Sequence, residues 1–192
     1  MEAKGALKRL GKKVHKSDKA LVENAGQLRN PALRQGMRLM SALGEPWTLY
    51  PVAGLVGARW VATGRKADAL TLALSIGGSG LLNKVLKLVV ERPRPRHTLH
   101  RQDPSGSSFP SNHITMSLCA YGALAYLALA RQEKRPVRWR LSRLGLVALL
   151  IVAIGYSRIF LGVHYPSDVV GGWLVGVGWL GLCLLLKRYI LT

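Results

Sequence analysis

The sequence predicts an all-α membrane protein, a polytopic helical bundle of about five transmembrane helices that follow an N-terminal amphipathic segment. Of its 192 residues, 49% are hydrophobic, yet 28 Lys and Arg against 9 Asp and Glu give a net charge of +19. The two properties coexist because charged and apolar residues occupy separate stretches of the chain. A bilayer core about 30 Å thick needs ~20 mostly apolar residues in a helix. The predicted spans are residues 46–63, 69–90, 114–130, 144–163 and 169–186.

A soluble all-helical protein is the alternative to a membrane bundle, and two features disfavour it. The apolar stretches lack the polar face that a surface helix needs. Glycines also fall inside these stretches, for example Gly77 and Gly78 in the second and Gly171 and Gly172 in the last. Glycine allows helices to approach closely in a membrane, whereas it destabilises a helix in water. The sequence therefore favours the membrane bundle.

The first 44 residues differ from the rest, with ten Lys or Arg, three acidic residues and no long apolar run. We expect two short amphipathic helices on the membrane surface, with their basic side chains towards anionic lipid headgroups. The second helix should begin at Asn30-Pro31, an N-cap followed by a first-turn proline. A disordered basic tail up to about residue 17 is the alternative. The chain thus divides into a basic amphipathic interfacial segment, residues 1–44, and a membrane-embedded domain, residues 45–192.

Composition also argues against several other classes of function. Strong positive charge is typical of nucleic-acid binding, but here the charges flank apolar spans and no nucleic-acid motif is present. Cys119 and Cys183 lie within apolar runs, so no disulfide framework is expected. His97 and His100 have no neighbouring Cys or carboxylate pair to complete a metal site. We therefore expect no metal, no cofactor and no nucleic-acid partner, and the sequence leaves the oligomeric state open.

Two polar loops interrupt the apolar spans. The first, residues 91–112, follows the second span, and the other lies between the fourth and fifth spans. Counting the spans places both loops, and the end of the second span, on one side of the membrane. We therefore expect a single pocket at one membrane surface, formed by Lys87, Arg94, Ser111, His113, Arg158, His164 and Asp168.

Three residues of this pocket are cations, Lys87, Arg94 and Arg158, with no matching set of acids nearby. Cations in a partly dehydrated site are costly unless an anion is bound there. Guanidinium forks and an ammonium group suit the oxygens of a phosphate. Ser111 and the backbone N–H groups at the start of the third span would add hydrogen bonds at a helix N-terminus. The pattern indicates a phosphate-binding site.

Two histidines add chemistry to this site. His164 and Asp168 are four residues apart, so the carboxylate can hold the imidazole in one tautomer and stabilise its charged form. That arrangement makes His164 a candidate nucleophile towards phosphorus. His113 can then act as the general acid that protonates the leaving oxygen. The set predicts phosphoryl transfer without a metal ion.

The other basic residues near the pocket have simpler explanations. Lys84 lies one turn before Lys87 and is expected to line the pocket or extend towards the headgroups. We expect the remaining arginines of the first loop to be loop solubilisers or headgroup contacts rather than members of the site. These are Arg92, Arg96 and Arg101.

Three blocks of the sequence resemble the signature blocks of the type 2 phosphatidic acid phosphatase superfamily. They occur in the family's order within residues 69–185, each at the end of a predicted span on the same face. The sequence departs from the common pattern in two places. Asn112 stands where many members have Gly, and the basic segment replaces the first of six spans. The blocks are Lys87-x6-Arg94-Pro95, Pro110-Ser111-Asn112-His113 and Ser157-Arg158-x5-His164-x3-Asp168.

The resemblance implies a helical membrane phosphatase that hydrolyses lipid phosphate or diphosphate monoesters without metal. Carried over by position, His164 forms a phosphohistidine, Asp168 orients it and His113 is the acid. The implied phosphate-binding residues are Lys87, Arg94, Ser111 and Arg158.

Loop charges give opposing indications of orientation. Residues 131–143 carry six Lys or Arg and one Glu, which predicts a cytoplasmic loop and an active site on the outer face. The basic N-terminus, however, lies on the same side as the active site if there are five spans, and its charge would reverse the orientation. We expect an integral protein of the bacterial inner (plasma) membrane with an extracytoplasmic active site. A cytoplasmic site is the alternative.

A phosphate pocket at the bilayer surface can receive a lipid headgroup while the acyl or prenyl chains stay in the membrane. The candidate substrates are a polyprenyl phosphate or diphosphate, phosphatidic acid and phosphatidylglycerol phosphate, and we favour polyprenyl carrier lipids. Two other classes of function stay open. One is a lipid phosphotransferase that uses the same histidine intermediate, and the other is a membrane transporter or lipid-phosphate binder without turnover.

Overall fold

The computed structural model describes residues 2–26, 30–95 and 106–191, and within these ranges it contains helices and no strand. The predicted all-α fold is therefore confirmed for this part of the chain. Arg96, His97, His100 and Arg101 lie outside the described residues. The helices are α1 (Glu2–Gly26), α2 (Pro31–Ala42), α3 (Pro46–Ala62), α4 (Lys66–Val90), α5 (Asn112–Ser117), α6 (Ala123–Leu129), α7 (Val137–Phe160) and α8 (Pro166–Leu186), with π-helical segments η1 (Leu118–Gly122) and η2 (Lys187–Leu191).

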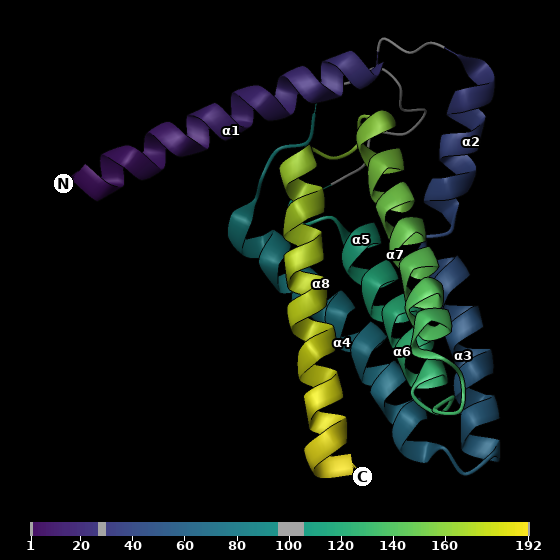
Figure 1. Cartoon of the computed structure of the whole chain (residues 1–192). Coiled ribbons are helices and arrows are strands. Elements are labelled where there is room, and N and C mark those ends of the chain that lie inside the picture. Colours follow the sequence, from purple (N-terminus) through teal and green to yellow (C-terminus); the bar gives the residue numbers. More distant parts are fainter. Residues whose placement is uncertain (1, 27–29, 96–105, 192) are drawn as a thin grey trace.

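Helices α3 to α8 run side by side in an elongated bundle, and α1 lies across one end of it (Figure 1). The two N-terminal helices are present as α1 and α2, but only α1 lies across the bundle end; α2 runs alongside the last turns of α7 instead of lying flat as expected (Figure 1). Asn30 caps α2 as expected, because its Oδ1 accepts hydrogen bonds from the backbone N–H of Ala32 at 2.9 Å and of Leu33 at 3.2 Å. Instead of a disordered tail, α1 is helical from Glu2 onwards.

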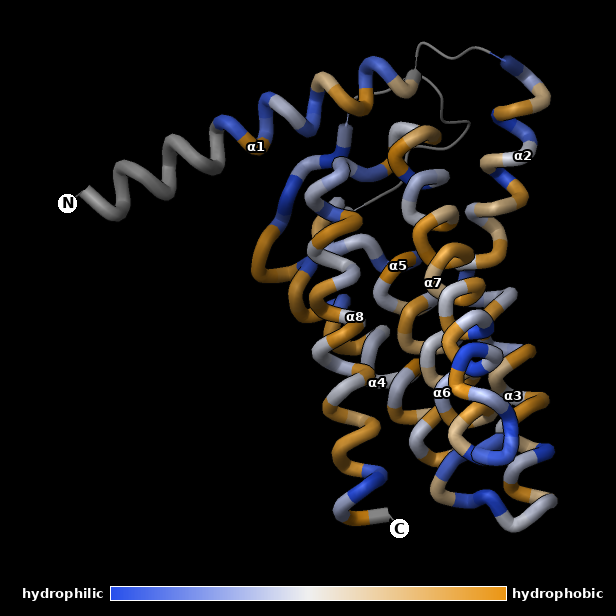
Figure 2. Tube along the Cα trace, viewed as in Figure 1, coloured by the Kyte–Doolittle hydropathy of each residue, from blue (hydrophilic) through white to orange (hydrophobic). Residues whose placement is uncertain are grey.

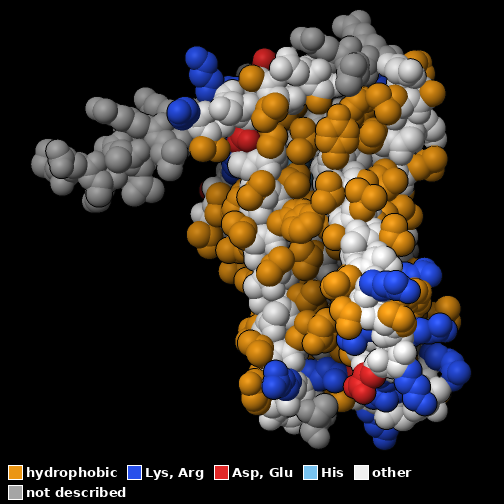
Figure 3. Space-filling view, viewed as in Figure 1, with side chains coloured by type: hydrophobic (Ala, Val, Ile, Leu, Met, Phe, Trp, Pro, Cys, Tyr) orange, Lys and Arg blue, Asp and Glu red, His pale blue; other side chains and the backbone are white. Residues whose placement is uncertain are grey.

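Three helices in the described part of the chain are long and apolar enough to cross a membrane, namely α4, α7 and the continuous helix Pro166–Ile190. Apolar residues recur along the helices of the bundle (Figure 2), and apolar side chains cover most of the face drawn in Figure 3, except at the basic end away from α1. Among them are Leu55, 77% exposed, and Leu174, 71% exposed. An apolar surface of this extent is typical of contact with lipid. The number of about five spans stays a prediction, since α3 has 17 residues and α5 and α6 are shorter.

Glycines bring the last helix against the start of α5. A Cβ atom at Gly171 would lie 2.2 Å from the Phe109 ring, and one at Gly172 would lie 2.9 Å from the backbone oxygen of Ser111. Larger side chains would therefore force these segments apart. The close approach fixes α5 against the first turns of α8, which positions both polar loops at the same end of the bundle.

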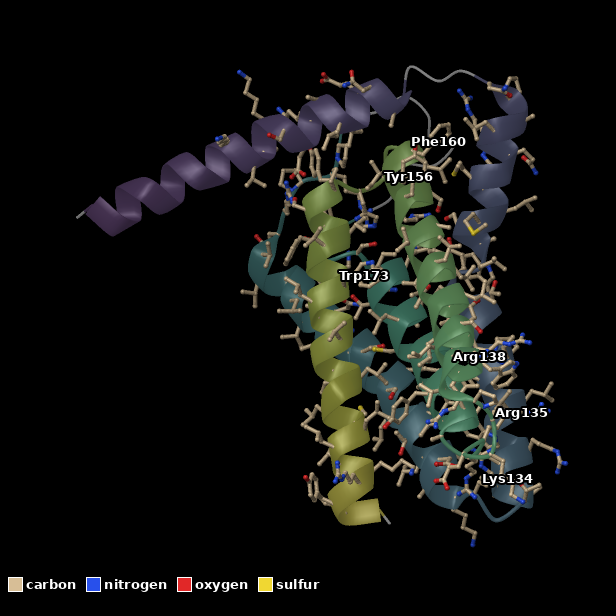
Figure 4. All side chains as sticks on the ribbon, viewed as in Figure 1. Lys134, Arg135, Arg138, Tyr156, Phe160 and Trp173 are labelled. Carbon is tan, nitrogen blue, oxygen red and sulfur yellow. The ribbon has the colours of Figure 1, made fainter. Side chains whose placement is uncertain are left out.

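A charged cluster closes the opposite end of the bundle. Asp68, at the start of α4, is 2% exposed. Its carboxylate lies 2.8 Å from Arg65 Nε, 3.2 Å from Arg131 Nε and 3.3 Å from Lys187 Nζ. The carboxylate thus links α4, the α6–α7 connection and the C-terminal η2 segment. Lys134, Arg135 and Arg138 lie at this same end, away from α1 (Figure 4).

The substitution Asp68→Asn is expected to destabilise the fold without changing the activity of the molecules that remain folded. The neutral amide loses hydrogen bonds between charged groups, each worth roughly 1.5–3 kcal/mol. We expect the thermal unfolding midpoint in detergent to fall by several degrees. Glu133→Gln, an exposed acid in the α6–α7 connection, is the charge-matched control. Equal midpoints for the two variants would show that the cluster does not stabilise the bundle.

Candidate active site

The predicted site residues meet at the end of the bundle that α1 crosses. Lys87 is in the last turn of α4 and Arg158 in the last turn of α7, while Asp168 is in the first turn of α8. Ser111 is the N-cap of α5, and His113 follows it. The structure therefore brings together side chains from five separate segments, as expected from counting spans.

The turn between α7 and α8 presents His164. Gly162 has φ +69, a left-handed conformation that favours glycine, and the chain there turns back so that the backbone N–H of Val163 donates to Arg158 O at 3.1 Å. His164 follows with 2% of its surface exposed. Its Nδ1 lies 3.6 Å from Asp168 Oδ2, and this oxygen also accepts a hydrogen bond from the backbone N–H of Tyr165 at 2.9 Å. The imidazole and the carboxylate thus face each other across the first turn of α8.

Burial decides the charge of this histidine. Desolvation lowers the pKa of His164 to about 3, and the charges of Arg158 and Arg94 act in the same direction, against the opposing effect of Asp168. The imidazole is therefore neutral at physiological pH, the form in which a ring nitrogen has a free lone pair. Its Nε2 lies 3.5 Å from Arg94 Nη1, so the reactive nitrogen is next to a cation.

Residues 106–111 fold back on the end of α4 and hold two of the cations. Lys87 Nζ donates to the backbone oxygen of Ser107 at 2.6 Å. Arg94 donates from Nε to Gly106 O at 3.2 Å and from Nη1 to Val163 O at 3.1 Å. Backbone carbonyls therefore orient both side chains without neutralising their charge. Both cations keep a net positive charge to offer to an anion.

Several buried polar atoms at this end have no hydrogen-bond partner among the described residues. Buried polar groups in folded proteins are nearly always paired, so such a cluster calls for an explanation. Two of them are the donors Ser111 Oγ and Arg158 Nε. An anion with several acceptor oxygens would satisfy both donors together. His113 Nε2 and His164 Nδ1 also make no hydrogen bond of good geometry, but each of them faces a carboxylate, that of Glu45 and that of Asp168.

The corner between α2 and α3 supplies two partners that the sequence did not single out. Arg158 Nη1 donates to Ser41 Oγ, and His113 Nε2 lies 2.8 Å from Glu45 Oε1. Burial tends to raise the pKa of Glu45, but contact with His113 and the charge of Arg158 outweigh it and hold the pKa below its usual value. Glu45 is therefore anionic at neutral pH. Its place at the start of the first span, on the same side as the polar loops, was the signal that could have identified it.

The prediction for Arg92 is wrong. Instead of facing solvent or headgroups, its guanidinium donates from Nη1 to Asp168 Oδ1 at 2.7 Å and to Ser167 Oγ at 2.6 Å. Nη2 donates to Asp18 Oδ2 of α1 at 2.8 Å, and the guanidinium stacks on the Tyr165 ring at 4.5 Å. The planar fork, which would also suit a headgroup, is used here to join two carboxylates.

An open cavity of about 360 Å³ lies between α1 and the segment after α4. His15 and Lys19 of α1 line it together with Arg94 and Tyr165. Arg94 thus belongs both to this cavity and to the surroundings of His164. Within the described ranges, no group of three or more His, Cys, Asp and Glu is arranged to hold a metal ion.

Comparison with known proteins decides the family. The model of the family described as the PAP2 superfamily matches residues 68–191. The chain belongs to the PAP2 superfamily. This PAP2 chain is 32% identical over 166 residues to phosphatidylglycerophosphatase B of Bacillus subtilis, a match that covers 85% of the chain and 80% of the relative. It is also 33% identical over 153 residues to a decaprenylphosphoryl-5-phosphoribose phosphatase of Mycolicibacterium smegmatis, covering 74% of the chain and 72% of that relative.

Solved structures agree with this assignment. The PAP2 chain superposes with a TM-score of 0.83 and 31% identity on the crystal structure of a transmembrane PAP2-type phosphatidylglycerolphosphate phosphatase from Bacillus subtilis. That match covers 92% of this chain and 87% of the other. Aquifex aeolicus LpxE matches with a TM-score of 0.64 and 25% identity, over 86% of this chain and 93% of that one. The PAP2 chain is therefore an integral membrane protein of a phosphatase family, and the predicted enzyme class is confirmed.

Proposed function

We propose that this PAP2 protein hydrolyses a phosphate or diphosphate monoester of a membrane lipid through a phosphohistidine on His164, without a metal ion. The observation that carries the proposal is the convergence of a neutral imidazole, its carboxylate partner and three cations at one end of an apolar bundle. A lipid can place its headgroup at this end while its tails lie along the apolar sides.

The reaction follows from the positions of the side chains. His164 Nε2 attacks phosphorus, and the bond from phosphorus to the lipid oxygen breaks while His113 gives its proton to that oxygen. Asp168 stabilises the positive charge on the phosphorylated ring. Neutral His113 then takes a proton from water, whose oxygen attacks phosphorus and breaks the phosphorus–nitrogen bond. Inorganic phosphate leaves, and the cations Lys87, Arg94 and Arg158 with Ser111 stabilise the phosphoryl oxygens throughout.

The membrane arrangement is part of the proposal. We assign the five predicted crossings to α3, α4, residues 114–130, α7 and the helix that begins at Pro166. Three of these, α4, α7 and the last helix, are long and apolar enough to cross a membrane by length and composition. The basic α6–α7 connection lies at the end away from the site, which supports an extracytoplasmic site in a bacterial inner membrane. The helix α1 then lies at the surface beside the site, with its basic side chains near anionic lipids.

Two substrate classes are supported best. Relatives named for undecaprenyl- and decaprenyl-linked substrates support a polyprenyl phosphate or diphosphate carrier lipid. A relative matched over 80% of its length and a solved structure matched over 87% of its length are named for phosphatidylglycerol phosphate, which makes that lipid the second candidate. Both present a phosphate at the level of the headgroups.

The test is inorganic phosphate release by detergent-purified protein in EDTA. The panel contains a polyprenyl diphosphate, a polyprenyl phosphate, phosphatidic acid and phosphatidylglycerol phosphate, each with wild type and His164→Ala. We expect release by the wild type that vanishes in the variant, and the ranking of rates identifies the lipid. No release from any of the four, or release that requires added metal, would contradict the proposal.

The pH dependence of Glu45→Gln tests the role of His113. Burial lowers the pKa of His113, and Glu45 raises it in opposition. A neutral amide at position 45 removes this support, so the pKa of His113 falls further and the protonated acid is lost at a lower pH. We therefore expect the basic limb of the kcat/KM profile to move to lower pH, while Glu45→Asp keeps the charge and moves it less. An unchanged basic limb in Glu45→Gln would exclude Glu45 as the partner of the general acid.

A further inference from the structure

We propose that Asp18 of the N-terminal helix is a positioning residue of the active site, acting through Arg92 and Asp168 on His164. This inference rests on the proposed function, because it assigns α1 a part in presenting the nucleophile. It gives the basic N-terminal segment a role beyond contact with the membrane surface.

Asp18 is an unusual member of α1. It is 4% exposed on a helix whose described side chains are mostly at the surface. Its Oδ1 accepts a hydrogen bond from the backbone N–H of Ser167 at 3.1 Å, and its Oδ2 accepts from Ser167 Oγ and from Arg92 Nη2. Ser167 is in the first turn of α8, where backbone N–H groups have no partner within the helix. Asp18 therefore stabilises the N-terminus of the helix that follows His164.

Arg92 connects this contact to the catalytic pair. One edge of its guanidinium faces Asp18 at 2.8 Å, and the other faces Asp168 Oδ1 at 2.7 Å. A planar guanidinium between two carboxylates has its orientation fixed by both. The Asp168 carboxylate is in turn fixed so that its second oxygen, Oδ2, is the one that faces His164 Nδ1 at 3.6 Å. The contacts form a continuous series Asp18–Arg92–Asp168–His164.

The charge of Asp18 matters as well as its position. Arg92 alone next to Asp168 would oppose the positive charge that develops on His164 when the ring attacks phosphorus. The second carboxylate offsets the charge of Arg92, so Asp168 keeps more of its capacity to stabilise the charged ring. We therefore expect Asp18 to affect formation of the phosphohistidine, a chemical step, more than binding of the lipid.

A purely structural role, in which Asp18 only attaches α1 to the bundle, is the competing explanation. The variant Asp18→Asn separates the two, because the amide oxygen can still accept from the Ser167 backbone while the amide nitrogen repels Arg92. Other contacts continue to attach the helix, among them Val22, 2% exposed, and the His15 ring, 5.5 Å from the Tyr165 ring. The substituted protein should therefore fold with α1 in place.

The first experiment is a double-mutant cycle on phosphate release with Asp18→Asn, Arg92→Gln and the pair. We expect Asp18→Asn to lower kcat about tenfold with KM within about twofold of wild type. The double variant should be no slower than Arg92→Gln alone, because Asp18 acts through Arg92. Glu133→Gln, a charge-matched change at the opposite end, should behave as wild type. The proposal would be overturned if Asp18→Asn lowered kcat by the same factor in wild type and in Arg92→Gln, or if it changed KM alone.

A second readout does not depend on turnover. In protein labelled with 15N-histidine, the His164 ring signals are assigned by their loss in His164→Ala, and their shifts report which ring nitrogen carries the proton. We expect the wild type and Glu133→Gln to show the Nδ1–H tautomer, and Asp18→Asn to show a mixture. An unchanged spectrum in Asp18→Asn would refute the positioning role even if no lipid is hydrolysed. If no lipid of the panel releases phosphate, the proposed function is refuted, while the positioning role of Asp18 is still decided by the spectrum.

Discussion

Replacing His164 with alanine is expected to lower phosphate release by at least roughly a thousandfold, to the uncatalysed background. The other imidazole of the described site, His113, comes from α5 and contacts Glu45, so it does not take the place of His164. The fold should survive, because Asp168 keeps its bonds to the Tyr165 N–H and to Arg92. Thermal unfolding in detergent checks this point.

A trapping experiment identifies the intermediate directly. Wild-type protein quenched during turnover of a lipid with a 32P-labelled phosphate should carry label that is stable in base and lost in acid, as a phosphohistidine is. His164→Ala should carry none, whereas Asp18→Asn should accumulate it more slowly. Label that persists in His164→Ala would place the nucleophile elsewhere.

Arg158→Lys is expected to reduce kcat/KM by about a hundredfold, the usual effect of removing one donor to a developing phosphoryl charge. Arg158 is held by Ser41 through Nη1, and its buried Nε has no partner among the described residues. Lysine keeps the charge but has a single nitrogen, so it cannot bond Ser41 and a phosphate oxygen in the same geometry.

Arg138→Lys is a matched control for this variant, because Arg138 is exposed on the same helix at its opposite end (Figure 4). It should leave turnover unchanged. Inhibition by orthovanadate, a phosphate analogue, should weaken in Arg158→Lys and stay the same in Arg138→Lys. Wild-type kinetics and vanadate inhibition in Arg158→Lys would mean that Arg158 only anchors α2.

The sequence predicted the placement of the site residues where a charged or candidate catalytic side chain lies at the end of an apolar run. Lys87, Arg158 and His164 each lie within a few residues of such an end, so counting spans was enough to place them together. The number of spans could not be fixed in the same way. The helix α3 and the interrupted α5–η1–α6 segment are too short for their length alone to decide whether they cross a bilayer.

The sequence pattern did not predict side-chain contacts between segments that are distant along the chain. In the sequence, Asp18 is one of three acidic residues in a basic segment that was expected at the membrane surface. It contacts Ser167, 149 residues later, because α1 lies across the end of the bundle. The prediction for Arg92 failed for the same reason. The local sequence around a loop arginine does not show whether its side chain faces solvent or lies between two carboxylates, as Arg92 does. Such contacts depend on the tertiary path of the chain rather than on local periodicity.

The two termini of the chain lie at opposite ends of the bundle, and this has a practical consequence (Figure 1). An affinity tag or reporter fused after the C-terminal η2 segment stays at the end of the bundle away from the catalytic groups. One fused before Glu2 extends the helix that carries Asp18, whose N-terminal end projects away from the bundle (Figure 1). Purification tags and reporters therefore belong at the C-terminus, because a fusion at the N-terminus pulls on the helix whose Asp18 contacts Ser167.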